Sequence, residues 1–341
     1  MPPMIQIQHL RKEYKELVAV KDLNLELEAG DIFGFIGPNG AGKTTTIKML
    51  STLLTPTAGR AMVDGIDVVR YPEQVRGIVG YMPDFFGVYD DIKVWEYLDF
   101  FAAAYRIPRD KRPQIIDDVL TLTDLNVKKD SYVESLSRGM KQRLCLAKTL
   151  VHDPKVLLLD EPASGLDPRA RIEIKELLKE LKAMGKTIIV SSHILPELAD
   201  FCNKIGIIEK GEMIISGDVT DIIRQLAGHH TLEVRIYDEA VPNETGLDLG
   251  SLAAATPHEG GVAVKSTPAI ERATEILREM ESVADVKLGD NLLLVAYVGE
   301  PNQEWEVLRA LVRNDIKVLS FATQATDLED IFMRVTKGIV S

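Results

Sequence analysis

The sequence contains very little cysteine, since Cys145 and Cys202 are the only two among 341 residues. Two thiols are too few for a disulfide scaffold or a four-cysteine zinc site, so a reducing, cytosolic setting fits best. Long apolar runs are also missing: residues 100–104 and 292–298 fall far short of the roughly 18 residues that a membrane-spanning helix needs. The start has no basic segment followed by an apolar core, so we expect no secretory signal.

Basic residues are in the minority, with 40 Lys and Arg against 52 Asp and Glu and a net charge of −12. Nucleic-acid binders need a basic surface against phosphates, and proteins that adhere to anionic lipid need a polybasic face. The acidic balance therefore predicts no nucleic-acid partner. Any role at a membrane would have to run through a protein partner.

Apolar periodicity changes several times along the chain. Alternating runs over residues 5–36 predict strands, and a helical period holds from about residue 89 to 151. Strand-like runs then return, separated by helical patterns such as 172–184; they cover residues 156–159, 187–190 and 205–208. Strands that alternate with helices predict an α/β fold, a parallel sheet covered on both faces, with an inserted helical block.

The pattern changes again after about residue 227, where the predicted order is βαββαβ, typical of a small ferredoxin-like α+β domain. These elements are expected at residues 231–237, 269–280, 283–288, 291–298, 303–314 and 316–321, with a loop-rich stretch at 239–268 and a last amphipathic helix at 328–335. Because a chain of this length favours two domains, we expect domains at 1–225 and 226–341, with a helical subdomain at about 88–150.

A glycine-rich motif at residues 37–44 matches G-x-x-x-x-G-K-[ST]. Glycines let backbone N–H groups wrap phosphates, Lys43 would reach the β- and γ-phosphates, and the Thr44 hydroxyl would bind Mg²⁺. An ordinary glycine-rich turn could also carry this pattern, but here an apolar strand precedes it and an amphipathic helix follows it. The predicted phosphate-binding residues are Gly37, Pro38, Asn39, Gly40, Ala41, Gly42, Lys43, Thr44 and Thr45.

Two acidic residues, Asp160 and Glu161, follow the buried strand predicted at 156–159. The carboxyl ends of strands are where ligands bind in open α/β sheets, and a carboxylate there can hold Mg²⁺ through water. Glu161 is a candidate for polarising the water that attacks the γ-phosphate. A solvated Asp-Glu pair is the simpler interpretation of these two residues alone, but the phosphate loop makes the catalytic one preferable.

Residues 136–143, Leu-Ser-Arg-Gly-Met-Lys-Gln-Arg, resemble the signature of ATP-binding cassette (ABC) ATPases, usually written LSGGQ. Residues 164–167 resemble the D-loop of that family, His193 sits like its switch histidine, and Tyr14 stands where the family has an aromatic that stacks on adenine. Residues 4 to about 225 therefore resemble one complete cassette. The resemblance implies that Tyr14, Ser137, Gly139 and Asp167 help to bind ATP and that His193 takes part in catalysis.

The same resemblance implies a mechanism and partners. Two cassettes would close head to tail around two ATP molecules, so a second copy or a homologous cassette must supply the other half. The helical segment 88–150 is where such cassettes meet a separate transmembrane permease, and Phe85, Phe86, Tyr89 and Trp95 suit that contact. The C-terminal βαββαβ order and the ending 326–332 resemble drug-resistance and antibiotic exporters. The chain is then expected in the cytoplasm, held at the membrane by the permease.

The sequence departs from the family at three positions: Arg138 and Met140 replace a Gly and the Gln of the signature, and Asp84 replaces a usual Gln. Asp84 could bind the metal through water, or it could merely cap the turn after Pro83 and face solvent.

Two other functions fit the sequence less well. A soluble ABC protein acting on ribosomes or DNA is the main alternative, but ribosomal members usually carry two cassettes in one chain, and DNA-repair members insert a long coiled coil. Neither feature occurs in this sequence. An adapter that binds ATP without hydrolysing it is opposed by the intact Asp160, Glu161 and His193.

Overall fold

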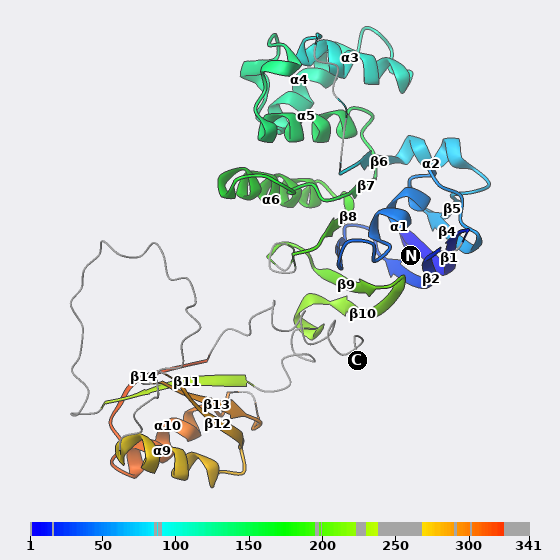
Figure 1. The fold of residues 1–341 in the computed structure, drawn as a ribbon. Helices are drawn as coiled ribbons and strands as arrows, with labels where there is room; N and C mark the ends of the chain where they lie inside the picture. The colour runs from blue at the N-terminus through cyan, green and yellow to red at the C-terminus, as the bar shows by residue number, and fades with distance from the viewer. Residues whose placement is uncertain are drawn as a thin grey trace. The chain divides into compact units, whose positions relative to one another are not determined.

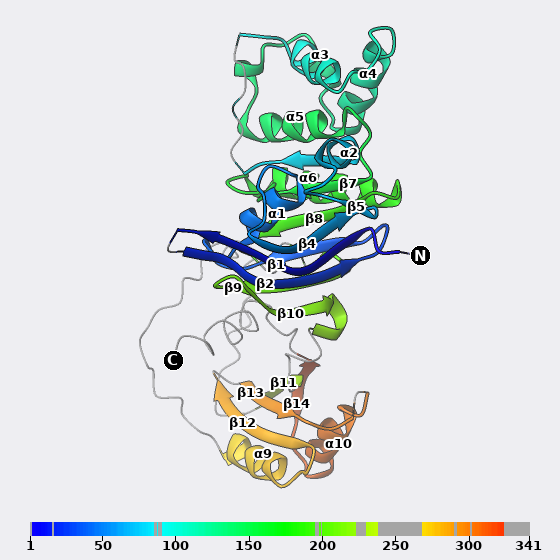
Figure 2. The same ribbon diagram turned by 90° about the vertical axis from the view of Figure 1, so that its right-hand side faces the viewer.

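The fold is described from a computed structural model (Figures 1 and 2), covering residues 2–15, 17–84, 87, 91–194, 198, 200–222, 230–237, 268–289, 292–300 and 302–323. The chain divides into two compact units, with the boundary after Ile222. Several sequence predictions lie outside the described residues: the aromatics Phe85, Phe86 and Tyr89, nearly all of the stretch 239–268, the helix at 328–335 and the ending 326–332.

A six-stranded sheet forms the centre of the first unit, in the order β10-β9-β3-β8-β7-β6. Five neighbouring strands run parallel and β10 adds an antiparallel edge, which confirms the predicted parallel sheet. Every residue of β3, β7 and β8 is buried, as expected for strands covered on both faces. The strands are β3 (Ile32–Ile36), β6 (Val79–Met82), β7 (Val156–Leu159), β8 (Thr187–Ser192), β9 (Lys204–Glu209) and β10 (Glu212–Asp218).

The first strands of the chain form a second, antiparallel sheet in the order β2-β1-β4-β5. Its members are β1 (Ile5–Tyr14), β2 (Leu17–Leu27), β4 (Ala58–Val63) and β5 (Ile66–Asp67). Periodicity predicted strands at the start of the chain but neither this separate sheet nor β4, β5 and β6. Helix α1 (Lys43–Leu50) packs with both sheets, since Ile7, Phe35 and Ile47 belong to one hydrophobic cluster. The segment between β3 and α1 therefore lies next to both sheets.

The predicted helical block contains α3 (Val94–Ala104), α4 (Arg112–Leu122) and α5 (Arg138–Leu150), which gather at one end of the first unit (Figure 1). Helical periodicity in the sequence places Ile115, Val119 and Leu122 on one face. On α4 the buried residues are Ile116, Val119 and Leu120, so Val119 was predicted correctly, whereas Ile115 and Leu122 are only half-buried. The reason is that α4 contacts both α3 and α5, which buries the positions facing both neighbours. The described residues of this unit also form α2 (Pro72–Ile78), α6 (Pro168–Ala183) and the 3₁₀ turns Asn126–Lys128 and Val133–Ser135.

The second unit confirms the predicted βαββαβ order. Its four strands pair antiparallel in the order β12-β13-β11-β14, and α9 and α10 share a hydrophobic core with the sheet. The elements are β11 (His230–Ile236), α9 (Pro268–Arg278), β12 (Val283–Gly289), β13 (Leu292–Tyr297), α10 (Trp305–Arg313) and β14 (Val318–Thr323). Within the described parts of both units, no helix combines the length and apolar character needed to cross a membrane.

Asp31 ties the turn before β3 to the start of β9. Its buried carboxylate accepts hydrogen bonds from Asn203 Nδ2 (2.7 Å), Lys204 Nζ (2.8 Å) and the backbone N–H of Glu28 (2.8 Å). Burial by itself would raise the pKa of Asp31, but these hydrogen bonds and the charge of Lys204 outweigh it, and the pKa lies below its ordinary value. The contacts fix β3, which leads directly into the glycine-rich loop.

The Asp31→Asn variant should therefore lower the free energy of unfolding by about 1–3 kcal/mol at pH 7, because an amide replaces a carboxylate that accepts charge-assisted hydrogen bonds. A depressed pKa in the folded state stabilises the protein above the unfolded value of about 3.9, and this stabilisation is lost as the pH falls through the folded pKa. Chemical denaturation should show that the difference in the free energy of unfolding between Asp31→Asn and the wild type decreases from pH 7 to about pH 3.

Asp22→Asn is the matched control, because that carboxylate is 60% exposed. It should change stability by less than about 0.5 kcal/mol. If the loss of stability in Asp31→Asn were the same at low pH as at pH 7, the ionised carboxylate would not be the source of the stabilisation.

Candidate functional site

The glycine-rich loop runs between β3 and α1 and is confined on two sides. A Cβ added at Gly37 would lie 2.2 Å from the carbonyl oxygen of Ile208 in β9. A Cβ added at Gly42 would lie 2.7 Å from the carbonyl oxygen of Ala19 in β2, and Gly42 also has a φ of +112°. Both sheets therefore press on the loop, and glycine is required at these two positions.

Helix α1 starts at this loop with an open N-terminus. Its N-cap is Gly42, which provides no side-chain cap, and no acidic residue lies in its first turn. The first backbone N–H groups of a helix have no partner within the helix, and the helix dipole adds positive charge there. Such an end attracts anions, and the exposed Asn39 and Gly40 leave the loop accessible.

Lys43, the first residue of α1, is only 5% exposed. Its Nζ donates to the carbonyl oxygens of Gly37 (2.6 Å) and Pro38 (3.2 Å) and lies 3.7 Å from Glu161 Oε1. Burial lowers the pKa of Lys43, and the carboxylates of Glu161 and Asp160 partly offset this. The ammonium group thus lies between the loop and the acidic pair, where the sequence predicts the phosphates.

Asp160 directly follows β7 and is 1% exposed. Its Oδ1 accepts hydrogen bonds from Thr44 Oγ1 (3.1 Å) and Ser191 Oγ (2.7 Å). The structure therefore brings together Thr44 and Asp160, the two main predicted metal ligands. One hydroxyl and one carboxylate fit Mg²⁺, which keeps several waters and takes other ligands from substrate phosphates. In the described part of the chain no three His, Cys, Asp or Glu residues form a metal site by themselves.

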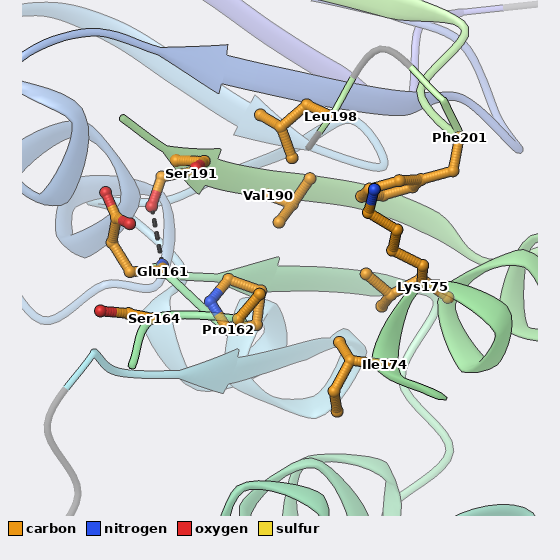
Figure 3. A pocket seen from close by; sticks show the side chains of 12 residues that line it. Glu161, Pro162, Ser164, Ile174, Lys175, Val190, Ser191, Leu198 and Phe201 are labelled. Carbon is orange, nitrogen blue, oxygen red and sulfur yellow. Dashed lines mark hydrogen bonds between the residues drawn. The ribbon is translucent and has the colours of Figure 1, made fainter. Parts of the chain in front are cut away.

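Glu161 has a left-handed backbone, with a φ of +49°, a strained conformation that is common at functional sites. Its backbone N–H donates to Ser191 Oγ at 2.9 Å (Figure 3). Its Oε2 lies 2.9 Å from His193 Nδ1, so the two predicted catalytic residues are in contact. Its Oε1 is buried without a hydrogen-bond partner, which leaves an acceptor for a further donor such as water.

Ser191 is the residue of this site that the sequence analysis missed. The apolar run ends at Val190, but β8 continues to Ser192. The available signal was the pair of serines directly after that run, at the same sheet edge as Asp160. A small pocket of about 330 Å³ backs the Glu161 turn, with Ile174, Leu198 and Phe201 in its lining (Figure 3). Much of that lining is apolar, so the turn presents its polar groups on the side of Lys43 and His193.

The signature and D-loop residues form a second cluster. Ser137 caps α5 by accepting from the N–H of Met140 (3.3 Å), and Asp167 caps α6 by accepting from the N–H of Ala170 (2.9 Å). A Cβ added at Gly139 would be 3.3 Å from the Cβ of Ala170, so the two helix starts lie close together.

Tyr14 and Asp84 lie at the margin of the site. Tyr14, the last residue of β1, pairs with Leu17, the first residue of β2. Leu17 lies two residues before Ala19, whose carbonyl oxygen faces Gly42. It is 42% exposed, and Lys12 Nζ is 5.1 Å from its ring centroid. Asp84 is exposed, yet its charge acts on the buried groups nearby: burial raises the pKa of Tyr81 to about 12, and the carboxylates of Asp160 and Asp84 add to this.

Comparisons with known proteins agree on one family. Residues 20–164 match the family described as ABC transporter. A Nod factor export ATP-binding protein of Cupriavidus metallidurans is 37% identical over 234 residues, 69% of this chain and 77% of that protein. The linearmycin resistance ATP-binding protein LnrL of Bacillus subtilis is 29% identical over 333 residues, 98% of both chains. A dimeric ATP-binding cassette in a post-hydrolysis state, bound to ADP and Pi, has a TM-score of 0.59 and 25% identity, over 63% of this chain and 99% of that one.

Gly37→Ala should destabilise the protein more than Gly40→Ala, although both change the same loop. At Gly37 the new methyl group meets a backbone carbonyl, and overpacking of this kind costs up to about 3 kcal/mol. At Gly40 nothing lies within 4 Å, and only the φ of +81° opposes a side chain, at about 1 kcal/mol. Urea unfolding of both variants would measure the difference. Equal losses of stability in the two variants would show that β9 moves to accommodate the methyl group.

Proposed function

Because this chain belongs to the ABC transporter family of ATP-binding proteins, we propose that it powers an exporter whose transmembrane permease is a separate polypeptide. The chain itself is an ATPase. Export is supported by the relatives, which are a Nod factor export protein and a linearmycin resistance protein. The observation that carries the proposal is the meeting of Lys43, Asp160, Glu161 and His193 beside the open N-terminus of α1.

Nucleotide binding is assigned to the glycine-rich loop and its surroundings. Residues 37–45 would hold the phosphates, with Lys43 turning from the loop carbonyls toward the β- and γ-phosphates. Tyr14 would stack on adenine. Thr44 and Asp160 would hold Mg²⁺, Asp160 through water, and Asp84 would act on the same ion through a further water. Mg²⁺ neutralises negative charge that develops on the phosphates.

Hydrolysis is assigned to Glu161 and His193. Glu161 Oε1, which makes no hydrogen bond within the chain, would accept one from the attacking water and so polarise that water. The other oxygen, Oε2, accepts from His193 Nδ1–H, which holds the carboxylate in one orientation. His193 is exposed, and its remaining ring nitrogen, Nε2, would donate to a phosphate oxygen when the ring carries both protons.

A second copy of the chain, or a homologous cassette, would complete each site. Ser137, Gly139 and Asp167 would face the nucleotide of the other protomer, with the free N–H groups at the start of α5 directed at its γ-phosphate. The dimeric relative bound to ADP and Pi supports this arrangement. Residues 1–225 would then act as the cassette and residues 226–341 as an accessory domain.

The permease would dock on a groove between the central sheet and the helical block. This groove has a volume of about 900 Å³, and Leu53, Tyr81, Phe101 and Tyr105 are among its lining residues. Leu53 is 60% and Tyr105 40% exposed, and apolar exposure of this kind is typical of a surface that receives an amphipathic helix. Trp95, which was expected at such a surface, is half-buried. This contact would hold the protein at the cytoplasmic face of the membrane.

Glu161→Gln should retain ATP binding, lower turnover by at least about 100-fold and accumulate a nucleotide-bound dimer, because size is preserved while the charged acceptor is lost. Phosphate release and size-exclusion chromatography with ATP and Mg²⁺ would measure this. Lys43→Ala should instead weaken ATP binding itself, since a phosphate-neutralising charge is removed. Near-normal turnover of Glu161→Gln would show that Glu161 does not polarise the attacking water.

Asp84→Ala should leave basal hydrolysis within about tenfold of the wild type, a change in barrier of about 1.4 kcal/mol. The larger effect should fall on stimulation of hydrolysis by the permease. Rates with and without the permease in lipid vesicles would separate the two effects. If Asp84→Ala abolished basal turnover as fully as Glu161→Gln, Asp84 would be a catalytic group.

A further inference from the structure

Arg138 contacts the D-loop of its own chain. It is the first residue of α5, and its Nη2 donates to the carbonyl oxygen of Ser164 at 3.3 Å. The guanidinium also lies against Gly165, where an added Cβ would be 2.1 Å from Nη2 and 2.3 Å from Cζ. The glycine of the consensus signature could make neither contact. The departure at position 138 therefore adds a link between the signature and the D-loop.

The residue held by Arg138 is also bonded to the catalytic turn through its backbone N–H group. The backbone N–H of Ser164 donates to the carbonyl oxygen of Glu161 at 3.0 Å, and that of Leu166 donates to Ala163 at 3.3 Å. Glu161 has the strained left-handed backbone noted above. Two hydrogen bonds thus lead from the signature helix, through Ser164, to the residue assigned to polarise water.

A second side chain of α5 supports the same turn. Gln142 is 5% exposed, and its Nε2 donates to the carbonyl oxygen of Pro162 at 2.7 Å. Positions four apart lie on the same face of a helix, so Arg138 and Gln142 both face residues 162–165. Gln142 is buried at this contact, whereas Arg138 is exposed and lies next to Ser137. A change in the conformation of Ser137 would therefore act on Arg138 more directly than on Gln142.

We propose that Arg138 is a positioning residue that couples the two ATP sites of the dimer. The inference rests on the proposed function, in which Ser137 and Gly139 face the ATP of the other protomer and Glu161 acts on the ATP of its own. Arg138 joins these two groups within one chain. When one ATP contacts the signature, Arg138 orders Ser164 and Glu161 of the same chain, and Glu161 then acts on the other ATP. Binding at one site thus favours hydrolysis at the other, which is a coupling between sites in the thermodynamic sense.

The first test is ATP hydrolysis by the full-length protein as a function of ATP concentration. The wild type should show a Hill coefficient clearly above 1, whereas Arg138→Ala should give about 1, with kcat lowered about three- to tenfold and half-saturating ATP changed less than about twofold. Arg138→Lys keeps a donor for Ser164 but loses the flat guanidinium, so its Hill coefficient should be intermediate.

Arg272→Ala is the matched control. Arg272 is also an exposed arginine whose Nη2 donates to a backbone carbonyl, that of Asn314, at 3.3 Å, but it belongs to the second unit. This variant should keep the wild-type Hill coefficient and kcat.

The second test does not depend on turnover. In nucleotide-free protein, the amides of Glu161 and residues 163–166 should exchange hydrogen about tenfold faster in Arg138→Ala than in the wild type or Arg272→Ala, because the turn loses an external support. Absence of hydrolysis by the wild type would refute the proposed function, while the exchange result would still decide whether Arg138 holds the turn.

Three results would overturn the coupling role. They are a wild-type Hill coefficient of 1, unchanged exchange and cooperativity in Arg138→Ala, or a raised half-saturating ATP concentration at an unchanged Hill coefficient. The last would place Arg138 on the nucleotide of the other protomer.

Discussion

The site depends on the hydroxyl group of Ser191. A serine hydroxyl has one proton to donate, and here the proton goes to Asp160 Oδ1 while the oxygen accepts from the backbone N–H of Glu161. These two bonds join the end of β8 to the end of β7 and hold Glu161 in its left-handed conformation. The hydroxyl is fully buried, so its bonds act in a medium of low dielectric constant and are strengthened accordingly.

The glycine-rich loop takes its shape from two sheets rather than one. The central sheet contributes the Ile208 carbonyl at Gly37, and the antiparallel sheet contributes the Ala19 carbonyl at Gly42. Lys43 is buried between them, where the carboxylates of Glu161 and Asp160, the charge of Asp84 and the loop carbonyls offset the cost of removing its charge from water. The N–H groups at the open start of α1, together with the Lys43 ammonium, are the donors that would bind an anionic ligand here, and they are the physical basis for the proposed phosphate binding.

Helix α5 connects the surfaces assigned to two different partners. Its first turn carries Ser137 as N-cap and Arg138 beside the D-loop, and near its other end Lys148 and Thr149 line the groove assigned to the permease. Thirteen residues in a helix span about 20 Å as one stiff element. A shift at the signature turn would therefore be carried to the groove by one continuous helix, with no loop between them.

Local patterns in the sequence were sufficient to predict the glycine-rich loop, the Asp160–Glu161 pair and the βαββαβ order of the second unit, because each is encoded by residues that are close together in the chain. The pairing of Thr44 with Asp160 was also predictable, since the loop and the end of a parallel strand meet at one sheet edge. The separate antiparallel sheet, the buried face of α4, the bridge made by Ser191 and the contact of Arg138 with Gly165 were decided only by the tertiary structure. Each of these depends on which distant segments pack together, and hydrophobic periodicity records that a residue is buried without recording its partner.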